Sequence, residues 1–260
     1  MGIINVTPDS FADAGRCFDR DAAIARGLLL AGEGADLIDV GGESTRPGAE
    51  AVPAGLEAER VVPVIAELAR LLPRMPISVD TTKPEVAARA LEAGASIVND
   101  ITAGSSQGML ELVGRCGAGI VLMHMRGTPA DMQRDTRYAD VVAEVHSFLL
   151  ERARAAMAAG IPRDRVFLDP GIGFGKDLEG NLRLIAALPD LAALGHPVVL
   201  GASRKSFIGK LTGAPVGSRL PGSLAAVAAA ADLERAVVRV HDVAATVQFL
   251  AVLGATRRAA

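Results

Sequence analysis

The feature that most constrains the fold is a regular alternation of short apolar runs with longer Ala- and Leu-rich stretches. The runs are rich in Val and Ile and predict eight strands, at residues 2–5, 36–40, 76–80, 96–99, 119–123, 165–169, 197–201 and 236–240. Helices are predicted over residues 21–33, 55–72, 84–94, 140–159, 179–194, 220–232 and 242–254, with a weaker one at 107–116. Parallel neighbouring strands need a crossover connection, and these helices supply it. The alternation therefore predicts an α/β fold with a parallel sheet.

The number of units indicates how that sheet is arranged. Eight βα units within 260 residues are typical of a closed (β/α)₈ TIM barrel, and an open doubly wound sheet is the alternative. No linker interrupts the pattern, so residues 1–260 are expected to form a single domain. Half of the residues are hydrophobic but only 3% are aromatic, so the core must be built from Ala, Val, Leu and Ile.

Composition excludes several classes of partner. The net charge is -3 with both signs mixed along the chain, which argues against a nucleic-acid surface. No segment reaches the ~20 apolar residues of a membrane span. Cys17 and Cys116 lie far apart without a metal-type spacing. The sequence therefore predicts a soluble cytoplasmic protein with free thiols.

Polar residues follow every predicted strand, at the end where barrel enzymes hold their active sites. They are Asn5, Glu43 to Arg46, Asp80, Asn99 with Asp100, His124, Asp169, Ser203 to Lys205, and Arg239 with His241. Each has a structural alternative: Asp80 could cap a helix at Pro84, Ser203 could cap one at Arg204, and His124 could be a core histidine. A single site explains all eight strand ends more simply than eight separate structural roles.

Two of these strand ends carry specific patterns. Residues 169–176 read Asp-Pro-Gly-Ile-Gly-Phe-Gly-Lys, which has neither the dinucleotide nor the Walker spacing. Its glycines would let a flat ligand approach the backbone, and Phe174 could stack on that ligand. Arg239 and His241 lie two residues apart on a strand, so both point to the same side and could grip an anion.

Eight motifs, in chain order, resemble those of the dihydropteroate synthases: residues 5–11, 39–48, 78–83, 98–100, 122–127, 169–176, 203–206 and 239–242. The resemblance spans the chain. One departure is at residues 12–15, which read Ala-Asp-Ala-Gly where the family tends to read Ser-Asp-Gly-Gly.

The resemblance implies a reaction and a set of roles. A transferase of this family condenses 6-hydroxymethyl-7,8-dihydropterin pyrophosphate with 4-aminobenzoate, giving 7,8-dihydropteroate and pyrophosphate in folate biosynthesis. The pterin residues would be Asp80, Asn99, Met123, Asp169, Phe174 and Lys205. The pyrophosphate would be held by Asn5, Arg239 and His241, with Mg²⁺ as cofactor and Asn5 as its candidate ligand. The 4-aminobenzoate residues would be Thr45, Arg46, Pro47, Ser203 and Arg204. The catalytic set would be Asn5, Lys205, Arg239 and His241.

The resemblance further implies a homodimer and sensitivity to sulfonamides. Loops at residues 7–9 and 45–47 are expected to close over bound pterin pyrophosphate. Two other functions stay open at this point: a barrel that passes a methyl group from methyltetrahydrofolate to a corrinoid, and a pterin-binding paralogue without turnover. Pyrophosphate release that depends on both substrates would separate the three.

Overall fold

The computed structural model describes residues 1–7, 20–46 and 48–259. Its strands are β1 (Gly2–Asn5), β2 (Ile38–Gly41), β3 (Ile77–Asp80), β4 (Ile97–Asp100), β5 (Gly119–Met123), β6 (Val166–Asp169), β7 (Val198–Leu200) and β8 (Ala236–Val238). The predicted site residue Pro47 and the motif residues 8–15 lie outside the described residues. All eight predicted strands are confirmed.

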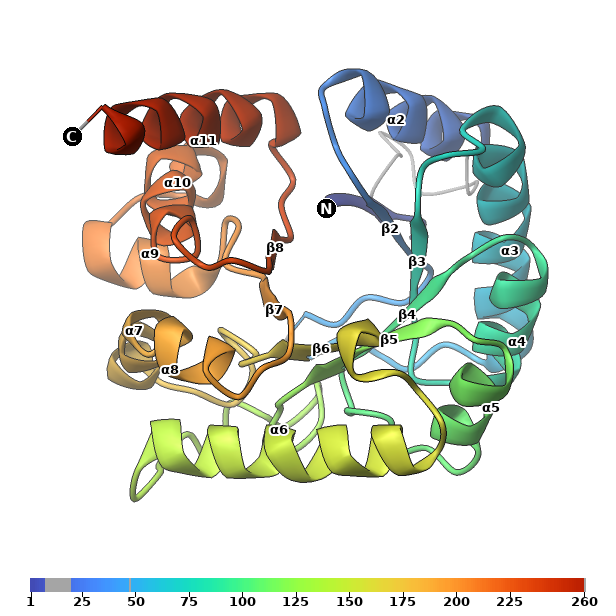
Figure 1. Ribbon diagram of the computed structural model, residues 1–260, viewed down its shortest axis with the longest axis horizontal. Helices are drawn as coiled ribbons and strands as arrows, with labels where there is room; N and C mark the ends of the chain where they lie inside the picture. Colours follow the sequence, from blue (N-terminus) through green and yellow to red (C-terminus); the bar gives the residue numbers. More distant parts are fainter. Residues whose placement is uncertain (8–19, 47, 260) are drawn as a thin grey trace.

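The helices form a ring around these strands (Figure 1). They are α2 (Arg20–Gly32), α3 (Ala54–Leu71), α4 (Pro84–Glu92), α5 (Met109–Arg115), α6 (Val141–Ala158), α7 (Leu178–Ala186), α8 (Leu188–Ala192), α9 (Ser206–Thr212), α10 (Leu220–Ala228) and α11 (Val243–Arg258). In α3, Val61, Val64, Ile65 and Leu68 are buried. This spacing makes one apolar face, which packs against the barrel.

The strands pair in chain order, and every pair is parallel. The sheet also closes on itself. Gly2 forms a parallel bridge with Val240, and the backbone N–H of Ile3 donates to the carbonyl of Val240 at 3.1 Å. The fold is therefore a closed (β/α)₈ barrel, and the open doubly wound sheet is excluded.

The interior follows from the composition. Ile38, Val79, Val98, Leu122 and Leu168 are almost completely buried, one from each of five neighbouring strands. Strands covered on both faces read as continuous apolar runs, which is why the sequence pattern was easy to interpret.

Two helices differ from the prediction. The single helix expected at residues 179–194 is two, α7 and α8, because Pro189 lies in the first turn of α8 and lacks the N–H that a continuous helix would need. Helix α9 is not among the predicted helices, although a helix beginning at Arg204 was part of the structural alternative for Ser203. It has only seven residues and ends at Gly213, whose positive φ of 76° suits glycine, so it carries too few residues to show a periodicity.

The part of the chain that the structure describes contains no helix long and apolar enough to cross a membrane. Cys116 is a free, exposed thiol as expected, whereas Cys17 falls outside the described residues.

Candidate active site

Three side chains gather around Arg239 inside the carboxyl-terminal mouth of the barrel: the predicted site residues Asp80 and Asn99, and Asp39, which was not predicted. Arg239 Nε donates to Asp39 Oδ2 at 2.7 Å, and its Nη2 donates to Asp80 Oδ2 at 2.8 Å. The side-chain amide of Asn99 donates to Asp39 Oδ2 at 3.2 Å. Strands β2, β3 and β4 and the chain after β8 thus contribute one group each. We call these four residues, Arg239, Asp39, Asp80 and Asn99, the arginine cluster.

Burial governs the charges of this cluster. It raises the pKa of Asp80 to about 7, with Arg239 opposing that rise and the carboxylate of Asp39 adding to it. Burial also lowers the pKa of Arg239, but the charges of Asp39 and Asp80 outweigh it and hold that pKa above its ordinary value. The guanidinium is therefore a permanent cation between two carboxyl groups, one of which can hold a proton near neutral pH.

Asp169, Lys205 and Phe174 form a second set, which we call the lysine group. Lys205 Nζ donates to the carbonyl of Ile172 and lies 4.5 Å from the centre of the Phe174 ring. Asp169 Oδ1 accepts the backbone N–H of Gly171 at 2.7 Å. Among the described residues, Lys205 forms no ion pair with a carboxylate, although Asp169 raises its pKa. The lysine group therefore keeps polar atoms that the protein itself does not pair.

The pKa values of this group reflect that arrangement. Burial lowers the pKa of Lys205 to about 8. Burial raises the pKa of Asp169, and the charge of Lys205 opposes the rise. Met123 ends β5 and is buried, and its register partner on the neighbouring strand β6 is Asp169. An apolar thioether and a ring beside a carboxyl and an ammonium group suit a flat heterocycle with a polar edge.

The glycine-rich stretch is shaped by Lys176, whose ammonium group lies inside the loop. It donates to the carbonyls of His124, Gly171 and Phe174 at 3.1, 3.0 and 2.8 Å. Its Nζ is also 3.0 Å from Nδ1 of His124. Burial lowers the pKa of His124 to about 3 and that of Lys176 to about 7, so the imidazole is neutral at pH 7 and its Nδ1 shares the donors of the lysine with the three carbonyls. His124 is thus the hydrogen-bonded core histidine that the sequence left as an alternative.

The loop after β7 meets the chain after β8. Ser203 Oγ accepts the backbone N–H of His241 at 3.2 Å and lies 3.0 Å from its Nδ1. Arg204 Nε donates to Asp242 Oδ2 at 2.9 Å, and Arg204 has a positive φ of 58°, which is unusual for a side chain with a Cβ. Burial, followed by the charges of Arg239 and Arg204, lowers the pKa of His241 to about 4. His241 is consequently neutral at pH 7.

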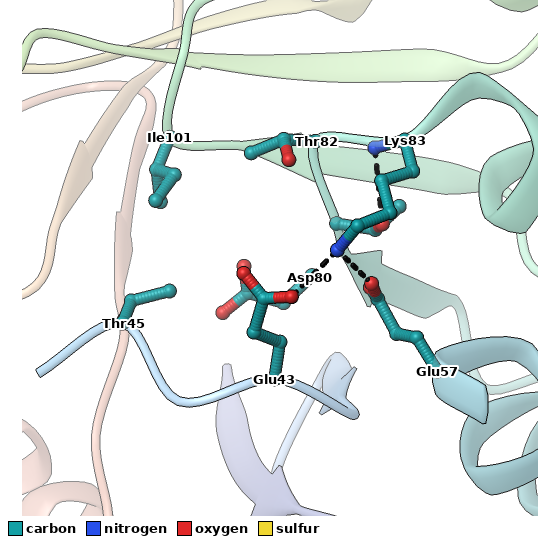
Figure 2. Close-up of a pocket in the computed structure, with 8 residues that line it drawn as sticks. Glu43, Thr45, Glu57, Asp80, Thr82, Lys83 and Ile101 are labelled. Carbon is teal, nitrogen blue, oxygen red and sulfur yellow. Dashed lines mark hydrogen bonds and ion pairs between the residues drawn. The ribbon is translucent and has the colours of Figure 1, made fainter. Parts of the chain in front are cut away.

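A small pocket joins two of the predicted subsites (Figure 2). Thr45, from the loop after β2, and Asp80, from β3, both line it. The charge of Arg46 is among those that lower the pKa of His241, so the same loop reaches toward the end of β8. The structure therefore brings the described residues predicted for 4-aminobenzoate close to those predicted for pterin and pyrophosphate.

The capping alternatives do not hold. Lys83 occupies the N-cap of α4, and Asp80 binds Arg239 instead. Lys205 occupies the N-cap of α9, and Ser203 contacts His241 instead. Asn5 ends β1 in register with Gly41, and a Cβ on Gly41 would lie 3.3 Å from Cβ of Asp80. Asn5 therefore belongs to the same rim of the barrel.

The sequence reasoning assigned no role to Asp39 or Lys176. Asp39 is completely buried, and so is nearly all of Lys176. A charged residue inside an otherwise apolar strand is almost never buried unless it is paired. The position of Asp39 between Ile38 and Val40, inside the predicted strand, was the signal that could have revealed it.

The class of protein follows from comparison with known families. Residues 1–241 match a family described as pterin binding enzyme, and the chain belongs to that family.

Within it, the chain groups with the dihydropteroate synthases, which are transferases of folate biosynthesis. It is 44% identical over 256 residues to the dihydropteroate synthase of Escherichia coli strain K12, covering 98% of this chain and 90% of that protein. It is 51% identical to the Xanthomonas albilineans enzyme solved with 4-aminobenzoic acid, with a TM-score of 0.92, covering 98% of this chain and 92% of the other. It is 41% identical to a Yersinia pestis enzyme solved with a sulfonamide drug, also with a TM-score of 0.92, covering 99% and 93%.

Proposed function

We propose that the chain condenses 6-hydroxymethyl-7,8-dihydropterin pyrophosphate with 4-aminobenzoate to give 7,8-dihydropteroate and pyrophosphate. The observation that carries the proposal is that the arginine cluster and the lysine group lie in the same mouth of the barrel. Asp169 and Asp80 both act on the pKa values of Arg239 and Lys205, so the two sets share one cavity rim. Similarity to the X. albilineans enzyme, which has also been solved with 7,8-dihydropteroate, supports the same reaction.

The lysine group would bind the pterin edge. A pterin presents neighbouring donors and acceptors, much as guanine does. Asp169 can accept from the donors because its Oδ2 accepts no hydrogen bond from the described residues. Lys205 can donate to a ring acceptor, and Met123 and Phe174 supply apolar surface for the ring faces. Asp80 and Asn99 would complete this subsite from the opposite side.

Arg239 and His241 would hold the pyrophosphate. The guanidinium has five N–H donors, and Asp39 and Asp80 engage Nε and Nη2. Nη1 makes no hydrogen bond in the described residues, so it remains for a phosphate oxygen. Neutral His241 can donate one hydrogen bond to the same anion. As the carbon–oxygen bond to pyrophosphate breaks, these groups would stabilise the departing negative charge.

The amine of 4-aminobenzoate would attack the methylene carbon as the bond to pyrophosphate breaks, and its nitrogen would then lose one proton to solvent. An aromatic amine is nucleophilic when neutral, so the chain needs to orient it rather than deprotonate it beforehand. Thr45, Arg46, Ser203 and Arg204 would form this subsite, together with Pro47, which lies outside the described residues. Ion pairing with Asp242 holds Arg204 in place and thereby shapes the loop that carries Ser203.

We further propose that Mg²⁺ accompanies the pyrophosphate. In the described residues no group of three His, Cys, Asp or Glu side chains could hold a metal ion. The amide oxygen of Asn5 is a suitable hard ligand, and it stands on the rim beside the arginine cluster. A cation that takes most of its ligands from phosphate and water fits such a site, since Mg²⁺ usually retains them. It would neutralise charge on the pyrophosphate.

One assay tests the reaction against its alternatives. Pyrophosphate release is measured with the pterin pyrophosphate, with and without 4-aminobenzoate, and with Mg²⁺ added or chelated. Release that requires both substrates supports the synthase. Binding without release would indicate an inactive paralogue, and transfer of a methyl group from methyltetrahydrofolate to a corrinoid would indicate the methyltransferase.

The same subsite should make the protein a sulfonamide target. A sulfonamide resembles 4-aminobenzoate but is bulkier beyond the ring. Ser203→Phe should therefore raise the inhibition constant of a sulfonamide more than the KM for 4-aminobenzoate, since the larger side chain clashes with the protruding group. Inhibition and substrate kinetics on both proteins check this. Equal increases would remove Ser203 from the subsite.

We also propose that the protein acts in the cytoplasm as a homodimer. Val247 and Val252 of α11 are 41% and 60% exposed, which leaves apolar surface on an outer helix for a second copy to cover. Light scattering of the wild type and of Val252→Glu tests this proposal: a dimer that the variant dissociates supports it.

A further inference from the structure

One ion-pair cluster beside the site has no part in the roles above. Lys83 Nζ lies 2.6 Å from Glu43 Oε2 and 2.5 Å from Glu57 Oε2 (Figure 2). Glu43 belongs to the loop after β2, Glu57 to the first turn of α3, and Lys83 immediately precedes α4. The ammonium therefore connects three segments that are separate in sequence.

The fixed side of this cluster is Glu57. Its side chain is 1% exposed, and its Oε1 finds no hydrogen-bond partner among the described residues. A buried carboxylate of this kind depends on its cation, because an uncompensated buried charge is strongly unfavourable. Burial lowers the pKa of Lys83, but its bonds to the two glutamates more than offset this and leave the pKa raised. Lys83 is thus a charged group held firmly against α3.

The other side of the cluster is a loop. Glu43 Oε2 accepts from Lys83 and also from the backbone N–H of Val52 at 2.8 Å. One carboxylate thereby ties together the beginning and the end of the segment between β2 and α3. Thr45 lies within that segment and lines the same pocket as Lys83 and Asp80. Arg46 lies in it as well.

The approach of this loop to α3 is close. A Cβ on Gly42 would lie 2.8 Å from a methyl group of Val61 and 3.1 Å from the carbonyl oxygen of Glu57. Arg60 of α3 donates to the carbonyl of Gly42 at 2.8 Å. The root of the loop therefore lies directly on the helix, and Lys83 holds the next residue, Glu43, in the orientation that this contact sets.

We propose that Lys83 is a positioning residue for the second substrate: through Glu43 and Glu57 it anchors the loop that carries Thr45 and Arg46 over the pocket. Lys83 acts through the loop and does not itself touch the reacting atoms. The substrate half of the proposal rests on the proposed assignment of 4-aminobenzoate to this loop.

Three variants test it. Lys83→Met removes the charge and keeps the length of the side chain. Glu43→Gln keeps the shape of the loop anchor and its bond to Val52, and leaves the Lys83–Glu57 pair intact in case Lys83→Met does not fold. Lys210→Met removes an exposed lysine that has no ion pair among the described residues and serves as the matched control.

Hydrogen exchange followed by mass spectrometry gives a readout that does not require activity. Exchange over residues 43–53 should accelerate in Lys83→Met and to a smaller extent in Glu43→Gln, with the strands and the Lys210→Met control unchanged. Unchanged exchange over residues 43–53 in both variants, or faster exchange throughout the barrel, would overturn the anchoring role.

Steady-state kinetics test the consequence for substrates. In Lys83→Met the KM for 4-aminobenzoate should rise about tenfold, while the KM for the pterin pyrophosphate should change less than about twofold. A parallel rise in both KM values would show a general structural role and overturn the proposal. If the wild type needs no 4-aminobenzoate, the proposed function fails together with the substrate half, and hydrogen exchange alone then decides the anchor.

Discussion

The two sides of the barrel mouth use similar polar residues in opposite ways. In the arginine cluster, the cation is bound by the carboxyl groups of Asp39 and Asp80, and the amide of Asn99 donates to Asp39. In the lysine group, the cation has a backbone carbonyl and an aromatic ring as its neighbours, and its pKa is lowered by burial. The first side is stabilised by ion pairs between its own members, and among the described residues only Nη1 of the guanidinium is left without a partner. The second side has no such ion pair, and Asp169 Oδ2 accepts no hydrogen bond from the described residues, so more of its polar atoms are left for a ligand.

This difference suggests how the protein separates stability from recognition. A paired buried charge is costly to disrupt, because removing one partner leaves the other uncompensated. A partly buried cation without a carboxylate partner costs stability while the site is empty, and a bound ligand can compensate that cost. We therefore expect substitutions in the arginine cluster to lower the stability of the protein most, and substitutions in the lysine group to weaken ligand binding with little change in stability.

The largest expected effect separates the two cations. Arg239→Met should lower the free energy of unfolding by about 3 kcal/mol, because Asp39 and Asp80 lose their shared cation. Lys205→Met should change it by less than about 1 kcal/mol, since among the described residues no carboxylate forms an ion pair with that ammonium. Urea unfolding of both variants at pH 7.5 makes the comparison. Equal losses would show that Lys205 is as much a structural cation as Arg239.

The next effect concerns recognition. Asp169→Asn should weaken the binding of a bare pterin by about 100-fold, because an amide offers one acceptor and places a donor against the pterin edge. Asp177→Asn is the matched control: Asp177 caps α7 through the N–H of Gly180, a role that Asn fills equally well. Calorimetry with a bare pterin gives the dissociation constants of the two variants and of the wild type. Normal binding by Asp169→Asn would leave Asp169 as a structural residue.

A smaller effect concerns the proton on His241. Its pKa in the free protein is about 4, and a neighbouring pyrophosphate should raise that pKa. Binding should therefore take up a proton, and the affinity advantage of wild type over His241→Gln should grow up to about tenfold as the pH falls from about 8 to 5. Calorimetric titration with pyrophosphate in two buffers of different ionisation enthalpy gives the number of protons taken up on binding. The same titration of His241→Gln corrects for protons taken up by pyrophosphate itself. A constant advantage across this range would place the anion away from His241.

The smallest effect is a pH dependence of stability. The pKa of Lys205 falls from 10.5 to about 8 on folding, so the folded protein binds fewer protons than the unfolded chain between these values. The contribution of Lys205 to stability is fully present above 10.5 and is lost as the pH falls through about 8. Between pH 7 and 10, the free energy of unfolding of the wild type should rise by on the order of 1 kcal/mol relative to that of Lys205→Met. This is less than the full shift in pKa would give, because the side chain is partly exposed to solvent. Unfolding curves at several pH values check the sign, and a fall in this difference with rising pH would contradict the lowered pKa.

The elements of the barrel were predictable from sequence because their signals are local. Strands buried on both faces need continuous apolar runs, and amphipathic helices need apolar residues every three or four positions. The exceptions were short or interrupted elements. Helix α9 has too few residues for a periodicity, and Pro189 divides what otherwise reads as one helix.

The candidate site was predictable only as a set of residues. Their positions at strand ends placed Asp80, Asn99, Asp169 and Arg239 on one rim, since the carboxyl ends of parallel strands meet there. Their roles as cap or site residue could not be separated, because Asp80 and Ser203 also fit the local rules for helix caps. The family resemblance supplied the roles that local pattern left open.

The sequence by itself determined the barrel, the rim and the chemical types of the groups on it. Only the tertiary structure decided which of these groups pair with one another: Arg239 with Asp39, across 200 residues of sequence, Lys83 with Glu43 and Glu57, and Lys205 with no carboxylate among the described residues. The physical reason is that hydrophobic periodicity is encoded over a few neighbouring residues. The charge state and freedom of a buried polar group, in contrast, depend on desolvation and on partners that only barrel closure brings within hydrogen-bonding distance.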